Sequence, residues 1–501
     1  MKNYIRRIKQ SKKLQLILFS GLIIQLIFCF TSVGYFHPDQ HFQIIEFSSF
    51  QLKEANATKD IWELSSNIRP TLQVYLFSAF KLFCFAISIE NPFYQLTILR
   101  FLQGVTFFIA FNMIAFYVCN TKPERTLIIT ILLLNFSWFL PYSRTLFSSE
   151  MVSALVFFPA LAFFHHCYLS NKTHLYNSVF TGFLLAASFF LRFQIAFAIT
   201  GFAIWILVFE KQFKISIYLL IGFVIGTATN IFLDYNFYHK LAFTPYLYFK
   251  VNILDGVAAS FGEKNFVFYI GVLSAIVGAP LISIFLLYNY VKTCIQQFNH
   301  PLILSTLIFI LGHFIIGHKE DRFMFTIICM IPMLLALNDN AYDFLSTSYK
   351  WKKIIIPILV FSTGLNFILL ILFIFNPYSQ TIHFEDILSS KISSEQTKVY
   401  CYQRTPLETE SHLPLVYYRK GFKNIEFITI HNIDSVMHLL SKPLLLASTF
   451  NDIKDKFGMI ESLGYKPQHY SSLMLWNLNM FLRRKNVNTI NDIWILYKLE
   501  K

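Results

Sequence analysis

A short charged run between two apolar segments carries residue types that could hold a phosphate group. The run covers residues 317–323, and the apolar segments beside it cover 302–316 and 323–337. Its polar members are His318, Lys319, Glu320, Asp321 and Arg322. Arginine and lysine bind phosphate oxygens, while carboxylates can bind sugar hydroxyls or orient the basic residues. Ionisable groups beside a bilayer are functional candidates by default, although a plain polar loop between two helices is the alternative.

A second polar cluster follows the first apolar span and contains His37, Asp39, Gln40, His41 and Gln43. Asp39 is the first acidic residue of the chain and follows Pro38, whose fixed φ stiffens the loop. A positioned carboxylate there could act as a general base. His37 and His41 can share a helical face, but no third ligand at regular spacing follows, so no metal site is expected. Two clusters at the ends of membrane segments suggest one shared site.

Composition identifies the class of protein. The chain has 501 residues, of which 55% are hydrophobic and 14% are charged, against about 25% charged in soluble domains. Apolar runs close to the length of a bilayer span recur, and one of them covers 71–89. They predict a polytopic α-helical membrane protein with about 11–12 transmembrane helices. The seven cysteines lack CxxC spacing, which argues against a disulfide framework or a zinc site.

Charge patterning predicts the topology. The basic N-terminus should remain in the cytoplasm, which places the loop 34–70 outside. Basic residues that flank cytoplasmic ends account for most of the net charge of +14, so the bilayer is the expected partner and nucleic acid is not. Parity beyond the first span stays open, because simple counting would place Lys122 and Arg125 outside. Within the loop, Ile44, Phe47 and Phe50 predict an interfacial amphipathic helix over 43–54.

The hydropathy pattern of the sequence changes near residue 376, after which no apolar run is long enough to span a bilayer. We expect a membrane domain over 1–376 and a small extramembrane α/β domain over 377–501. Strands are predicted near 398–402, 425–430, 443–447 and 493–497, and helices near 433–440 and 451–463.

Several other polar residues border apolar spans. Each fits a structural role, such as a helix cap or an anchor, but together they are candidates for substrate contact. They are Glu63, Arg69, Arg144, Arg192 and Asn252.

The order and the residues of these segments resemble those of glycosyltransferase family 22. This family comprises the polyprenyl-phosphate-mannose-dependent mannosyltransferases of GPI-anchor and N-glycan assembly. Residues 318–323 resemble the family's His-Lys-Glu-acidic-Arg-Phe motif, and His37-Pro38-Asp39 resembles its His-Pro-Asp-Glu segment. Gln40 departs from that pattern, because the family commonly has an acidic residue there. The likeness covers about 14–340 and points towards the GPI mannosyltransferases.

The resemblance implies a GT-C fold whose first external loop carries the catalytic Asp39. It implies inverting transfer of a sugar, with mannose favoured, from a polyprenyl- or dolichyl-phosphate donor to a lipid-linked or glycan acceptor, on the external or lumenal face and without a cofactor. Glu46 and Glu63 are the next candidates for the base. Donor phosphate and sugar contacts are expected from His318, Lys319, Glu320, Asp321, Arg322 and Arg192. Weaker candidates for substrate contact are His37, Gln40, Gln43, Glu63, Arg69, Arg144 and Asn252.

Two alternatives stay open at this point. A GT-C enzyme could use another polyprenyl-phosphate sugar, such as an arabinose or glucose donor. A transporter or flippase of a lipid-linked saccharide would explain the spans and buried charges, but not the extended first loop or the C-terminal domain. The composition favours a bacterial inner membrane, and a eukaryotic chain would lie in the ER membrane.

Overall fold

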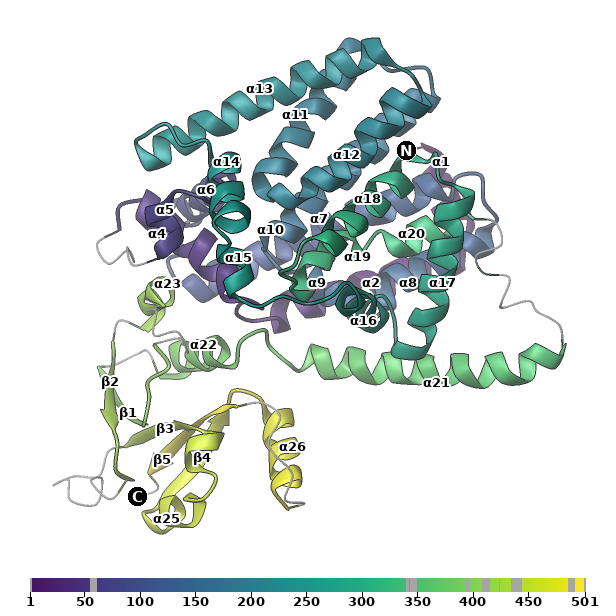
Figure 1. Ribbon diagram of the computed structural model, residues 1–501. Coiled ribbons are helices and arrows are strands. Elements are labelled where there is room, and N and C mark those ends of the chain that lie inside the picture. Colours follow the sequence, from purple (N-terminus) through teal and green to yellow (C-terminus); the bar gives the residue numbers. More distant parts are fainter. Residues whose placement is uncertain are drawn as a thin grey trace. The chain divides into compact units, whose positions relative to one another are not determined.

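The computed structural model describes residues 2–54, 61–338, 342, 349–392, 396–407, 415–422, 424–433, 444–484 and 492–499. It is mainly helical, with one five-stranded sheet (Figure 1). The chain divides into two compact units. The first comprises Met1–Cys29, Trp62–Leu76 and Arg100–Phe373, and the second comprises Phe30–Ile61, Phe77–Leu99 and Ile374–Lys501. The boundary expected at residue 376 stays a prediction, and the second unit also contains two earlier segments.

The apolar runs form helices of unequal length. Five stretches in the described part of the chain are long and apolar enough to cross a bilayer: α2 (Lys12–Thr31), α7 (Pro92–Val118), α10 (Ser149–Leu169), α13 (Phe213–Tyr238) and the Ile356–Ile374 part of α21 (Tyr349–Ile374). The bent pair α17 (Pro280–Gln296) and α18 (Pro301–Ile315) brings the number to six if it is one broken span. The shorter apolar helices are α6 (Leu72–Ala86), α11 (Leu175–Leu191), α12 (Ala196–Ile204) and α16 (Val267–Ile276). A multi-pass membrane protein is confirmed, and about 11–12 crossings remain a prediction.

Short helices complete the membrane-associated part. They are α1 (Lys2–Gln10), α3 (Pro38–Gln40), α4 (Phe47–Gln51), α5 (Trp62–Ser66), α8 (Glu124–Phe136), α9 (Leu140–Ser143), α14 (Thr244–Phe249), α15 (Val257–Ser260), α19 (Phe325–Ile328) and α20 (Ile331–Leu335).

Contacts at helix ends define the side of the N-terminus. Arg7 of α1 donates from Nη1 to the carbonyl of Cys119, just beyond α7, at 2.7 Å. Lys122 donates from Nζ to the carbonyl of Leu337, just beyond α20, at 3.2 Å. The end of α7 and the chain after α20 therefore lie on the N-terminal side. This places Lys122 with the N-terminus, where the positive-inside rule expects a basic loop.

The opposite ends of α2 and α7 also lie together. Arg100 of α7 donates from Nε to the carbonyl of Cys29 in α2, at 3.0 Å. The chain between these residues therefore leaves and returns on the side far from the N-terminus. The 15 residues of α6 span about 22 Å, which is shorter than the hydrocarbon core. That the run 71–89 crosses the membrane therefore stays a prediction, which the length of α6 does not support.

Small residues allow close packing between the helices of the first unit. Gly182 of α11 faces α13 so closely that a Cβ there would lie 2.0 Å from the carbonyl oxygen of Leu219. Gly222 of α13 is its counterpart, since a Cβ there would lie 1.9 Å from the carbonyl oxygen of Val179. Only glycine permits such backbone contact, which is a common way for helices to associate in a membrane.

The sheet of the second unit has the order β2-β1-β3-β5-β4. The strands are β1 (Thr397–Tyr402), β2 (Ile425–Ile430), β3 (Leu445–Thr449), β4 (Tyr465–Tyr470) and β5 (Trp494–Leu499). β1 pairs in parallel with β2 and β3, whereas β5 pairs antiparallel with β3 and β4. The helices are α22 (Gln380–Ile392), α23 (Val416–Arg419), α24 (Phe450–Ile453), α25 (Phe457–Ser462) and α26 (Leu473–Arg484).

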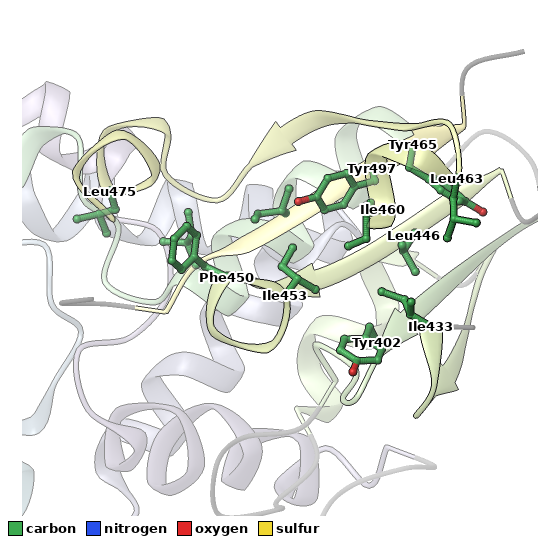
Figure 2. Close-up of a cluster of buried hydrophobic side chains, with 12 residues drawn as sticks. Tyr402, Ile433, Leu446, Phe450, Ile453, Ile460, Leu463, Tyr465, Leu475 and Tyr497 are labelled. Atoms are coloured by element: carbon green, nitrogen blue, oxygen red, sulfur yellow. The ribbon is translucent and has the colours of Figure 1, made fainter. Parts of the chain in front are cut away.

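One apolar cluster forms the core of this α/β part (Figure 2). It joins residues of β3 and β5, such as Leu446 and Tyr497, to Phe450 and Ile453 of α24 and Ile460 of α25. The small C-terminal α/β domain is thus confirmed, as are the four predicted strands and the helical segment 451–463. The predicted helix 433–440 lies almost wholly outside the described residues, and β4 was not predicted.

Candidate active site

Two buried arginines of the first unit share one buried carboxylate. Glu150, at the start of α10, has its Oε1 3.2 Å from Nη2 of Arg192 and 3.7 Å from Nη1 of Arg322. Arg192 follows the end of α11, and Arg322 lies in the short helix η5 (Asp321–Met324). Both guanidinium groups also face the ring of Phe323, at 4.9 and 5.6 Å. The side chains of Glu150, Arg192 and Arg322 are 1%, 6% and 7% exposed, so these three charged groups are largely shielded from solvent.

The remainder of the charged run extends from this pair. Glu320 accepts a hydrogen bond from Nε of Arg322, and its other carboxylate oxygen is 2.9 Å from Nε2 of His318. Nδ1 of His318 is 2.9 Å from the carbonyl oxygen of Gly262. Asp321 is exposed, and its carboxylate accepts the backbone N–H of Arg322 at 2.8 Å. The structure therefore brings His318, Glu320, Asp321, Arg322 and Arg192 together as predicted.

Lys319 has a different environment. Its ammonium donates to the carbonyls of His313, Phe314 and Ile316 at the C-terminal end of α18. These are carbonyls that the end of a helix leaves without partners. Burial lowers the pKa of Lys319, while the charge of Glu263 acts in the opposite direction. In this structure its three donors serve the helix end, so phosphate binding by Lys319 stays a prediction that these contacts do not support.

The arginine cluster lies on the side far from the N-terminus. Glu150 begins α10, and His165, near the other end of that helix, has its Nδ1 2.9 Å from the hydroxyl of Tyr117 at the end of α7. That end of α7 is on the N-terminal side. Glu150 and His165 are 15 residues apart in α10, which is about 22 Å along the helix, so Glu150 lies towards the opposite side.

Four further predicted residues of the first unit have local partners. Arg144 is fully buried, and its Nη1 donates to Oδ1 of Asn135 at 3.0 Å. Arg69 donates from Nε to Glu63 at 3.1 Å, with its guanidinium 5.4 Å from the ring centre of Tyr248. Asn252 donates to the carbonyl of Tyr248 one turn earlier, at 3.0 Å. Substrate contacts for Arg144, Arg69, Glu63 and Asn252 stay predictions.

Asp39 lies in the second unit, in the first turn after His37. The ring of His37 caps α3 by accepting the backbone N–H of Asp39 at Nδ1, at 3.3 Å. Gln40 completes a capping box, because its Oε1 accepts the N–H groups of Phe36 and His37 at 2.7 and 3.2 Å. Gln40 thus has a structural function in the loop, and the Asp39 carboxylate is not the helix cap. The side chain of Asp39 is 27% exposed, which leaves it accessible.

The helix predicted over 43–54 exists, but its interfacial character was predicted wrongly. A π-helical turn, η1 (His41–Glu46), leads into α4, and most of their residues are buried, with Gln43 only partly covered. Glu46 is fully buried and 2.8 Å from Nε2 of His41. Glu46 is therefore poorly placed to serve as a base in place of Asp39.

Glu150 is the residue that sequence reasoning left out of the site. The sequence does contain a feature that could have indicated it. Glu150 is the only acidic residue among positions 126–209, and it lies at the start of an apolar span. A carboxylate in such a position must have cationic partners.

Comparison with known proteins gives the family. The Alg9-like mannosyltransferase family matches residues 16–405. GPI mannosyltransferase 3 of Trypanosoma brucei brucei is 33% identical over 128 residues, which is 23% of this chain and 22% of that protein. The protein of the same name from Candida albicans is 33% identical over 132 residues, 26% of this chain and 24% of that protein. These alignments thus span about a quarter of the curated relatives.

A solved structure supports the predicted fold. ArnT from Cupriavidus metallidurans, crystallised with undecaprenyl phosphate, superposes with a TM-score of 0.50 at 10% identity, covering 96% of this chain and 97% of that one. Its apo form gives the same score at 9% identity. The fold is that of the GT-C glycosyltransferases, and the chain belongs to the Alg9-like mannosyltransferase family.

Proposed function

We propose that this protein is a membrane glycosyltransferase that transfers mannose from a polyprenyl-phosphate donor to a lipid-linked or glycan acceptor, with inversion and without a cofactor. The observation that carries the proposal is the pair of buried arginines on Glu150, on the face opposite the N-terminus. An anion of the size of a phosphate would find two planar guanidinium groups there. Such groups can each donate two parallel hydrogen bonds to phosphate oxygens.

The charges of the cluster favour exchange of one carboxylate for the donor phosphate. Glu150 is almost fully buried, whereas the Glu320 side chain is 24% exposed and lies in the loop after α18. A phosphate can take the place of Glu320 on Arg322 while Glu150 keeps both arginines oriented. His318, which contacts Glu320, would move with it. The lipid phosphate of the ArnT complex is the class of ligand that we extend to this chain.

Asp39 is proposed as the general base on separate grounds, since it lies in the other compact unit. Its loop is rigid at its start because of Pro38 and the capping box, and its carboxylate is accessible. The base takes the proton of the acceptor hydroxyl as that oxygen bonds to the anomeric carbon. The bond from the anomeric carbon to the phosphate oxygen breaks, and the lipid phosphate leaves on the arginines.

A GT-C enzyme with another polyprenyl-phosphate sugar would have the same phosphate site, so the sugar must be determined directly. Purified protein in liposomes is incubated with polyprenyl-phosphate [¹⁴C]mannose, glucose or arabinose and with candidate glycolipid acceptors. We expect mannose transfer and an inverted anomeric configuration in the product. Transfer of glucose or arabinose alone would refute the choice of sugar. Movement of lipid-linked saccharide between leaflets without a new glycosidic bond would refute the enzyme and support a flippase.

A further inference from the structure

The loop that carries Asp39 continues into a backbone conformation that is uncommon in proteins. Directly after the turn of Asp39, the chain forms the π-helical turn η1. π-helical hydrogen bonding is rare and is frequently found at functional sites. His41 and Glu46, at the two ends of this turn, are both fully buried.

Support for this turn comes from α23, which lies about 370 positions later in the chain. The His41 ring is stacked between Tyr35, at 5.4 Å, and Tyr418, at 5.3 Å between ring centres. Oε1 of Glu46 is 2.8 Å from Nε2 of His41 and also accepts the backbone N–H of Tyr417 at 3.0 Å. One carboxylate oxygen therefore joins the π-turn to α23.

A second connection lies at the far end of the loop. Glu54 has one carboxylate oxygen 2.6 Å from Nζ of Lys81 and the other 2.6 Å from Nζ of Lys420. Burial alone would raise the pKa of Glu54, but the hydrogen bonds from Lys420 and Lys81 outweigh it and hold the pKa below its ordinary value. Glu54 is therefore charged at neutral pH and fixes the end of the loop between two cations.

The supporting segment is itself anchored. The hydroxyl of Tyr417 donates to Oε1 of Gln95 at 2.6 Å, and the ammonium of Lys81 lies 5.1 Å from the Tyr417 ring centre. The segment that we call the clamp, residues 416–422, thus contacts the loop and α7 through buried groups of the same unit. It lies beyond residue 405, where the match to the family ends.

We propose that the clamp is a positioning element for the transfer reaction, with Lys420, Tyr417 and Tyr418 holding the Asp39 loop in its working conformation. This inference rests on the proposed role of Asp39. A displacement of about 1 Å in a reacting group can lower a rate by about a hundredfold. Loosening the clamp should therefore reduce turnover without weakening substrate binding.

The test uses Lys420→Met in the full-length protein, because the Lys420 side chain is 31% exposed and its loss leaves the Glu54–Lys81 pair in place. We expect kcat to fall about tenfold or more while the KM values of donor and acceptor stay near wild type. Hydrogen exchange over residues 37–54 should become faster. Lys420→Arg, which restores the charge, should recover both properties.

The matched control is Lys398→Met, which removes an exposed lysine that pairs with Glu426 at 3.5 Å in the same unit. It should resemble wild type in turnover and exchange. Unchanged exchange over 37–54 in Lys420→Met, or faster exchange with unchanged kcat, would overturn the proposal. If Lys420→Met does not fold, Glu54→Gln, which weakens the same contact, is subject to the same criteria.

The two proposals fail in different ways. Wild-type protein that transfers no sugar would contradict the proposed function, and the exchange measurement would still decide whether the clamp holds the loop. Active wild-type protein with unaffected Lys420→Met would contradict the clamp alone.

Discussion

Replacement of Asp39 by asparagine should abolish sugar transfer while leaving the protein folded. Asn keeps the size of the side chain but cannot take the proton of an acceptor hydroxyl. General bases contribute about 10² to 10⁴ in rate, which is about 2.7 to 5.5 kcal/mol of barrier. The variant should therefore retain at most about 1% of wild-type turnover.

The structure predicts a much smaller effect on stability. The cap of α3 is His37, which accepts the Asp39 backbone N–H, and that N–H is unchanged in Asn. The carboxylate does face Nδ1 of His37 at 3.6 Å, but the two side chains are 34% and 27% exposed. Pairs this exposed contribute about 0 to 1 kcal/mol. The loss in turnover should therefore greatly exceed the loss in stability.

The assay compares transfer per folded molecule, melting temperature and binding of donor lipid for wild type and Asp39→Asn. Asp255→Asn is the control, because Asp255 is an exposed carboxylate next to a π-helical turn, which it follows, whereas Asp39 precedes η1. Near-wild-type turnover of Asp39→Asn would refute the assignment. Glu46 and Glu63 would then be poor substitutes, since Glu46 is fully buried and Glu63 is bonded to Arg69.

Three other predictions concern topology, phosphate binding and pH. A cysteine at Ser65, which is exposed in α5, should react with a membrane-impermeant maleimide in intact cells; labelling only after permeabilisation would place this loop in the cytoplasm. Arg322→Lys should lower turnover per folded molecule about 30- to 1000-fold, because a two-point contact of about 2 to 4 kcal/mol is lost, whereas the exposed Arg125→Lys should have no effect; wild-type turnover of Arg322→Lys would remove the phosphate role. Burial holds the pKa of Glu385 well above its ordinary value, with Arg419 acting in the opposite direction. The folded state therefore keeps a proton that the unfolded state releases, and stability falls as pH rises above about 4. Glu385→Gln should thus melt higher than wild type by a margin that grows from pH 5 to pH 8, and a constant margin would contradict this.

Much of the fold was predictable because hydropathy and alternation are local. The apolar runs, the sheet and four of its strands follow from short-range pattern. β4 was not predicted from the sequence, because it is an edge strand that contains Pro467 and has an irregular register at that point. An edge strand tolerates proline and needs little apolar alternation.

The predictions that failed or lacked support depended on contacts between residues far apart in the chain, which a local sequence pattern does not contain. Hydropathy indicated an apolar run over 71–89, but the helix that forms there, α6, has only 15 residues. Ile44, Phe47 and Phe50 gave a pattern that fits a membrane surface, yet residues of the distant second-unit segments bury this helix. Lys319 belongs to the charged motif, and only the structure shows that its ammonium serves the end of α18.

The arginine cluster of the candidate active site also depends on contacts between distant parts of the chain. The sequence placed Arg192 and Arg322 among the phosphate candidates, 130 positions apart, but did not indicate that Glu150 would lie between them. The pairing of Glu150 with Arg192 depends on the packing of α10 against α11, and its pairing with Arg322 depends on the packing of α10 against α19, which follows η5.

The separation of 371 positions between Glu46 and Tyr417 has a consequence for biosynthesis. The ribosome therefore synthesises the Asp39 loop well before residues 416–422, which contact it. Chains are made at about 5 to 20 residues per second, so the loop waits tens of seconds for its partner. During that interval the nascent chain already has its first membrane helices but not the contacts that order the loop. The Asp39 loop can thus gain these contacts only after residues 416–422 have been synthesised.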